Sequence, residues 1–140
     1  MSAEKILVVE DNAMDMSILT SRLSAQGYYV SRAVNGSAAI RAARADMPDL
    51  MILDLTLMNE ERLNTPLWDG FSLLQWMRRT LPEMNVPVVI HTGSAYASVA
   101  AQARACGVSL VFEKSEDIGE LLAAVRKVLD ERKPKQAVGE

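Results

Sequence analysis

Polar side chains capable of metal and phosphoryl chemistry follow four apolar runs of the sequence. Glu10 and Asp11 come directly after the first run, and Asp54 follows a run of four apolar residues. Thr92 and Lys114 come at the ends of two later runs. Continuous apolar runs indicate strands covered on both faces, as in a parallel sheet. Open α/β folds place their chemistry at the carboxyl edge of the sheet, so we expect these side chains to converge there.

The three carboxylates predict a divalent metal site. Carboxylates that lie close together raise one another's pKa unless a cation lies among them. Oxygen ligands without His or Cys favour Mg²⁺ or Mn²⁺ over Zn²⁺, and Mg²⁺ typically combines a few carboxylates with phosphate oxygens. Glu10, Asp11 and Asp54 therefore indicate a Mg²⁺ site with room for a phosphoryl group.

Lys114 and Thr92 add groups that stabilise phosphoryl oxygens, a point charge and a hydroxyl donor. The sequence contains no glycine-rich phosphate loop and no nucleotide motif. We therefore interpret Asp54 as a residue that itself becomes phosphorylated by in-line transfer. Simpler roles remain open: the acidic residues could cap helices, Lys114 could be a solvated lysine, and Thr92 could be a turn hydroxyl.

Five apolar or mixed runs alternate with five helical patterns along the chain. The predicted strands cover 5–9, 28–33, 50–54, 86–91 and 108–113, and the predicted helices cover 13–26, 37–46, 71–80, 95–106 and 116–131. This alternation requires parallel, right-handed crossovers. We predict an α/β fold with a doubly wound five-stranded parallel sheet of order 2-1-3-4-5 and helices on both faces, with the polar strand 28–33 at an edge.

Apolar residues at helical spacing predict which side of each helix is buried. The expected buried residues are Met14, Ile18, Leu19 and Leu23 in the first helix, Phe71, Leu74 and Met77 in the third, and Ile118, Leu121, Leu122, Val125 and Leu129 in the fifth.

Length and composition predict one domain over 1–131 and a frayed tail over 132–140. The net charge of −3 gives no electrostatic indication that the protein binds DNA or an anionic membrane. The single cysteine, Cys106, cannot form an internal disulfide and suggests a cytoplasmic protein. No apolar run approaches the roughly 18–20 residues that cross a membrane.

Several motifs together resemble the response-regulator receiver domain, the chemotaxis-type, flavodoxin-like module of two-component signalling. They are Val8-Val9-Glu10-Asp11-Asn12, Pro48-Asp49-Leu50-Met51-Ile52-Leu53-Asp54, Asp69-Gly70, His91-Thr92-Gly93 and Lys114. The resemblance covers residues 5 to about 131. It implies that Asp54 accepts a phosphoryl group from a histidine kinase or a histidine phosphotransfer protein.

The resemblance also implies roles for the other site residues. Asp11 and Asp54 would ligate Mg²⁺ directly, Glu10 would act through water, and the backbone carbonyl of Thr56 would complete the protein ligands. Phosphorylation would draw Thr92 and Lys114 toward the phosphoryl oxygens. It would thereby change the face of the fourth helix, fifth strand and fifth helix, where a downstream protein would bind.

The sequence departs from the family pattern at three places. The segment between Asp54 and Gly70 is longer than usual, and its additional part, roughly Asn59 to Trp68, is expected beside the site. The aromatic switch position holds Val111, whereas Phe112 is one residue away and should face the other side of the sheet. The proline that normally follows the lysine is Ser115.

Two other functions are considered beside the phosphoacceptor. The chain could be a phosphorylation-independent interaction module in which the long loop blocks or replaces phosphorylation and the fold serves for docking only. An enzyme acting on phosphorylated small molecules is disfavoured, because its commonest design needs an aspartate at the position of Thr56.

Overall fold

The computed structural model describes residues 3–55, 70–81, 83, 85–93, 96–108 and 110–132. Within these ranges the predicted strands and helices are all present, with ends that differ from the prediction by at most two residues. The strands are β1 (Lys5–Val9), β2 (Tyr29–Ala33), β3 (Leu50–Leu53), β4 (Val88–Thr92) and β5 (Leu110–Glu113). The helices are α1 (Ala13–Ala25), α2 (Gly36–Ala45), α3 (Gly70–Thr80), α4 (Tyr96–Ala105) and α5 (Ile118–Arg132).

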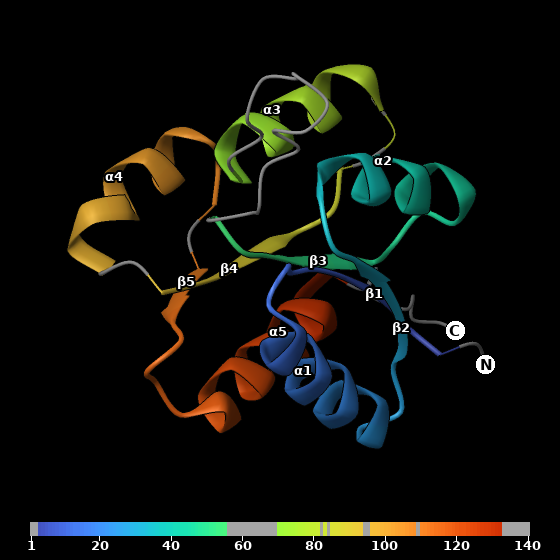
Figure 1. Ribbon diagram of the computed structural model, residues 1–140, viewed down its shortest axis with the longest axis vertical. Helices are drawn as coiled ribbons and strands as arrows, with labels where there is room; N and C mark the ends of the chain where they lie inside the picture. The colour runs from blue at the N-terminus through green and yellow to red at the C-terminus, as the bar shows by residue number, and fades with distance from the viewer. Residues whose placement is uncertain are drawn as a thin grey trace, which may run out of the picture.

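The strands form one parallel sheet in the order β2-β1-β3-β4-β5. Helices α1 and α5 cover one face, and α2, α3 and α4 cover the other (Figure 1). The predicted doubly wound fold is therefore confirmed, including the edge position of β2. The order places β1 beside β3, where the direction of winding reverses and open α/β folds bind their ligands.

Alternate residues of the central strands enter two separate cores. In β3, Met51 and Leu53 pack with α2, α3 and α4, whereas Leu50 and Ile52 pack with α1 and α5. All four side chains are at most 1% exposed. The continuous apolar run thus arises because both faces of the strand are covered by helices. This double coverage fixes the position at which Asp54 leaves the sheet.

Helix α1 is rotated relative to the prediction. Leu19 and Leu23 are buried as expected, and Met16 is buried with them, but Met14 and Ile18 are 72% and 45% exposed. The helix carries two apolar stripes, because its residues 14 and 18 are one turn apart on a different side from 16, 19 and 23. Periodicity alone does not decide which stripe faces the sheet. The prediction was wrong for Met14 and Ile18, because it combined residues of both stripes into one buried face.

The predicted faces of the other two helices are confirmed. Phe71, Leu74 and Met77 of α3 are buried, and so is its Leu73. In α5, four of the five predicted residues are buried, namely Leu121, Leu122, Val125 and Leu129. The fifth, Ile118, is half-buried.

Caps fix both ends of α1. The Asn12 side chain caps the amino-terminal end by accepting a hydrogen bond of 2.9 Å from the Asp15 amide. Gly27 follows the helix with a φ of 94°, a conformation that favours glycine. Because Asn12 follows the end of β1 so closely, the first turn of α1 begins at the carboxyl edge of the sheet.

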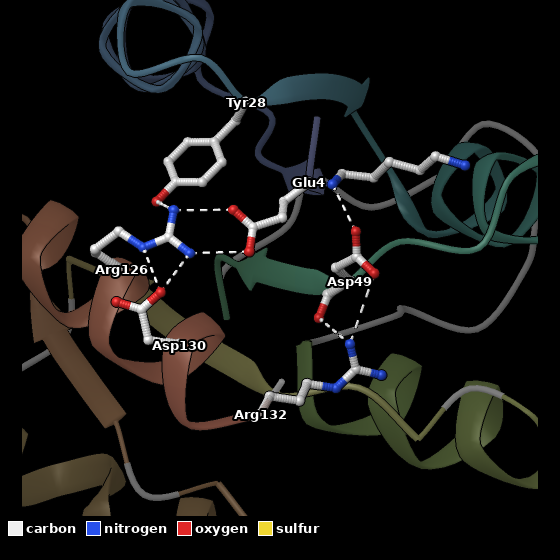
Figure 2. A network of polar contacts seen from close by, with 7 residues as sticks. Glu4, Tyr28, Asp49, Arg126, Asp130 and Arg132 are labelled. Atoms are coloured by element: carbon white, nitrogen blue, oxygen red, sulfur yellow. Dashed lines mark hydrogen bonds and ion pairs between the residues drawn. The ribbon is translucent and has the colours of Figure 1, made fainter. Parts of the chain in front are cut away.

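A polar network ties the last turns of α5 to the opposite, amino-terminal edge of the sheet (Figure 2). Arg126 donates to both carboxylate oxygens of Glu4 at 2.9 Å and to the Tyr28 hydroxyl at 3.2 Å. Arg132 lies 3.6 Å from the Asp49 carboxylate, which also accepts from the Lys5 amide at 2.8 Å. The network therefore anchors α5 beside the starts of β1, β2 and β3.

Leu55 and Gly70, the described residues on either side of positions 56–69, are bonded to each other. The Gly70 amide donates to the Leu55 carbonyl at 3.0 Å. A Cβ atom at Gly70 would lie 2.8 Å from the Leu55 Cα and 2.9 Å from the Asp54 carbonyl oxygen. Glycine is therefore required here by close backbone approach, which explains its place in the Asp69-Gly70 motif.

Several predictions concern residues outside the described ranges: the carbonyl of Thr56, the loop from Asn59 to Trp68, and the tail after Arg132. The domain boundary at 131 stays a prediction, and α5 continues through Arg132. Among the helices that the structure describes, none is both long and apolar enough to span a bilayer.

The orientation of α1 predicts different costs for two methionines of the same helix. Met16→Ala should lower the free energy of unfolding by about 2 kcal/mol or more, because it leaves a cavity in the core. Met14→Ala should change it by less than about 0.5 kcal/mol, because Met14 is exposed. Urea denaturation measures both, and equal losses would contradict the observed orientation.

The close approach at Gly70 predicts a second matched pair. Gly70→Ala should destabilise the fold by roughly 1–3 kcal/mol, because the added methyl group must displace backbone atoms. Gly93→Ala is the control, because a Cβ atom there meets no atom within 4 Å. Thermal melts of both variants test this, and a fully stable Gly70→Ala protein would contradict it.

Candidate functional site

Backbone hydrogen bonds continue past the strand ends and fix the site residues. The Asp54 amide donates to the Val9 carbonyl at 3.0 Å, and the Lys114 amide donates to the Thr92 carbonyl at 2.7 Å. The Glu10 amide continues the pairing of β1 with β2 in the same way, by a bond of 3.0 Å to the Ala33 carbonyl. The predicted residues are therefore held at one edge by the sheet itself.

The three acidic residues predicted to form a metal site lie close together. Glu10, Asp11 and Asp54 each offer a carboxylate oxygen, and these oxygens all lie within 4.8 Å of one another. Glu10 is 1% exposed and Asp54 is 3% exposed. Grouped hard oxygen ligands suit Mg²⁺. Among the described residues, Glu10 Oε1 is a buried atom that has no hydrogen-bond partner, which suits an atom that faces a cation or a water bound to it.

Lys114 joins this group as a cation. Its Nζ lies 3.1 Å from Glu10 Oε2, 3.1 Å from Asp54 Oδ2 and 2.8 Å from Asp15 Oδ2. Burial alone would lower the pKa of Lys114, but the hydrogen bonds to these three carboxylates outweigh burial and raise that pKa. Lys114 therefore remains charged and balances part of the buried negative charge.

Glu10 is a buried carboxyl group with a raised pKa. Burial, and to a smaller extent the negative charge of Asp54, raise its pKa to about 7 in total. The hydrogen bonds from the Asn12 amide and from Lys114 act in the opposite direction. Near neutral pH the metal-free site therefore exchanges a proton at Glu10.

Asp15 is a residue of this group that the sequence analysis missed. It lies in the first turn of α1, and its side chain is 31% exposed. Its signal in the sequence is an acidic residue near a helix start, which the helix dipole explains equally well. Its partner, Lys114, is 99 positions away along the chain, so local patterns do not show the contact.

The neighbouring residues of β4 and β5 lie at the same edge. Thr92 is fully buried, and it lies opposite Glu113 in the register, beside Lys114. The preceding His91 is 8% exposed, and burial lowers its pKa, as does the charge of Lys114. Thr56, the last predicted metal ligand, lies outside the described residues.

The expected difference between Val111 and Phe112 is confirmed. Val111 packs against the core beneath α2, α3 and α4, whereas Phe112 packs against the core beneath α1 and α5. No aromatic side chain of β5 therefore faces the α4 side, because consecutive residues of a strand point to opposite faces.

Comparisons with known proteins agree with this geometry. The family model for the response regulator receiver domain matches residues 6–126. The response regulator PleD of Caulobacter vibrioides is 31% identical over 96% of this chain, which spans 29% of PleD. Sporulation initiation phosphotransferase F of Bacillus subtilis is 30% identical, with 92% of this chain and 96% of that protein covered.

Solved structures show the same fold. The receiver domain of Francisella response regulator 1452 has a TM-score of 0.79 at 22% identity and covers 93% of this chain and 99% of its own. The BeF3-activated receiver domain of RstA from Klebsiella pneumoniae has a TM-score of 0.77 at 25% identity, with 93% and 100% covered. The chain therefore belongs to the family of response regulator receiver domains, the modules of two-component signalling.

Proposed function

We propose that the chain accepts a phosphoryl group on Asp54 from a phosphohistidine of a histidine kinase or a histidine phosphotransfer protein. The observation that carries this proposal is the position of Lys114, whose ammonium group contacts both buried carboxylates, Asp54 and Glu10. The Bacillus subtilis relative, which the chain covers almost completely, is named a phosphotransferase. That name supports the same chemistry here.

The transfer forms an aspartyl phosphate. A carboxylate oxygen of Asp54 attacks the phosphorus in line, while the bond from phosphorus to the donor imidazole breaks. The imidazole leaves with the electron pair. Lys114 stabilises the charge on the phosphoryl oxygens, and the Thr92 hydroxyl donates to them once it turns toward the group.

Glu10, Asp11 and Asp54 would hold Mg²⁺, together with the backbone carbonyl of Thr56. Bound there, the ion would balance the charges of the carboxylates and of the phosphoryl oxygens. The fit rests on the grouped oxygens and on the unpaired Glu10 Oε1 described above.

An exposed apolar pair supports the docking of a donor protein on α1. Met14 and Ile18 are one helical turn apart, and both are exposed. Between them along the helix lies Asp15, which contacts Lys114 at the site. A donor that covers this pair would bring its phosphohistidine to the same edge of the sheet. We infer that the downstream protein binds the separate face of α4, β5 and α5.

Phosphorylation of Asp54 predicts Mg²⁺-dependent labelling of the intact protein by acetyl phosphate. Asp54→Asn should abolish the added mass of one phosphoryl group in intact-protein mass spectrometry. Asp49→Asn is the control, because Asp49 lies at the opposite edge of the sheet and should leave labelling intact. Absence of labelling in folded, Mg²⁺-bound wild type would refute the proposal and favour a phosphorylation-independent interaction module.

The raised pKa of Glu10 predicts pH-dependent Mg²⁺ binding. Metal binding requires the ionised carboxylate, so the apparent affinity should fall as pH decreases through about 7, by up to about tenfold per pH unit. The same linkage applies to the stability of the metal-free protein. The contribution of neutral Glu10 to the free energy of unfolding is complete below its ordinary pKa of 4.5, and this contribution is lost as pH rises through about 7.

Mg²⁺ titrations followed by amide NMR between pH 6 and 8 measure this dependence. Glu10→Gln should give weaker but nearly pH-independent binding over the same range, because the glutamine side chain does not titrate. An equally steep pH dependence in Glu10→Gln would assign the proton to another group.

A further inference from the structure

The contacts of Lys114 use its whole capacity for donating hydrogen bonds. A lysine ammonium group has three N–H donors. Glu10, Asp15 and Asp54 are all within 3.1 Å of Nζ, and the contact with Asp15 is the shortest, at 2.8 Å. Lys114 therefore has to give up a partner before it donates to a phosphoryl oxygen.

Asp15 is the partner that Lys114 can lose at least cost. The side chains of Glu10 and Asp54 are 1% and 3% exposed, so water cannot readily replace a lost ammonium group. Asp54 also carries the phosphoryl group and stays beside Lys114 during the transfer. The side chain of Asp15 is 31% exposed, so water can solvate it once Lys114 leaves.

Asp15 is also held where it can compete with a phosphoryl group for Lys114. Its amide donates to the Asn12 side chain, which fixes the first turn of α1 beside the site. It is absent from the carboxylates that group as candidate metal ligands among the described residues. Its negative charge would therefore remain available to Lys114 when Glu10, Asp11 and Asp54 hold a cation.

We propose that Asp15 is a positioning residue that holds Lys114 in the unphosphorylated protein and competes with the phosphoryl group for it. The proposal rests on Asp54 being the phosphoacceptor. Lys114 then has two arrangements, one on Asp15 and one on the phosphoryl oxygens. Asp15 favours the first arrangement and so lowers the affinity of the site for a phosphoryl group.

The test compares variants of the full chain by titration with beryllofluoride at saturating Mg²⁺, followed by amide NMR. Asp15→Asn keeps the size of the side chain and removes its charge. It should therefore tighten beryllofluoride binding by about threefold, which lies within the range expected for the loss of a partly exposed ion pair. Asp15→Glu retains a carboxylate and should stay near the wild-type affinity.

Two controls separate this role from general charge effects and from structural damage. Glu120→Gln removes one exposed negative charge from the first turn of α5 and should leave the affinity unchanged. Introducing Asp15→Asn into a Lys114→Ala background should produce no gain, because the competition acts through Lys114.

Each outcome distinguishes the two proposals. Unchanged or weaker binding in Asp15→Asn, in a protein whose wild type binds beryllofluoride, would overturn the role of Asp15 alone. A gain of equal size in the Lys114→Ala background would overturn it too. If folded wild type neither binds beryllofluoride nor reacts with acetyl phosphate, the phosphoacceptor proposal itself fails.

Discussion

Repulsion among neighbouring carboxylates is the constraint on which the site depends. Glu10 and Asp54 are almost completely buried, and Asp11 lies close to both. Buried anions are strongly unfavourable without a nearby cation. Lys114 supplies one positive charge beside them, and burial, more than the charge of Asp54, raises the pKa of Glu10 to about 7. Grouped carboxylate oxygens of this kind suit a further hard cation such as Mg²⁺.

The rest of the fold holds these charges together. Hydrogen bonds beyond the strand ends fix the backbones of Asp54 and Lys114, and both faces of the central strands are closed by helices. Helix α5 follows soon after Lys114 and is anchored at the far edge of the sheet through Arg126 and Arg132. The lysine is thus carried by a short connection between two fixed elements, which limits the distance that it can move.

Much of this arrangement follows from sequence patterns. Alternating strand and helix patterns gave the sheet order, and the residues after each strand gave Glu10, Asp11, Asp54, Thr92 and Lys114. The orientation of α1 did not follow, because two apolar stripes compete and tertiary packing selects the one with Met16. Asp15 was missed because site residues were sought only directly after the predicted strands. Its contact instead joins the start of a helix to Lys114, 99 positions away.

The bond between the Leu55 carbonyl and the Gly70 amide has a consequence for the evolution of the chain. It holds Leu55 and Gly70 together beside Asp54, although fourteen residues separate them along the sequence. The entropy cost of closing a loop grows only slowly with its length. Insertions or deletions between residues 55 and 70 would therefore leave the strand register and the group of charges in place. New specificity can arise in that part of the sequence without rebuilding the carboxyl edge of the sheet.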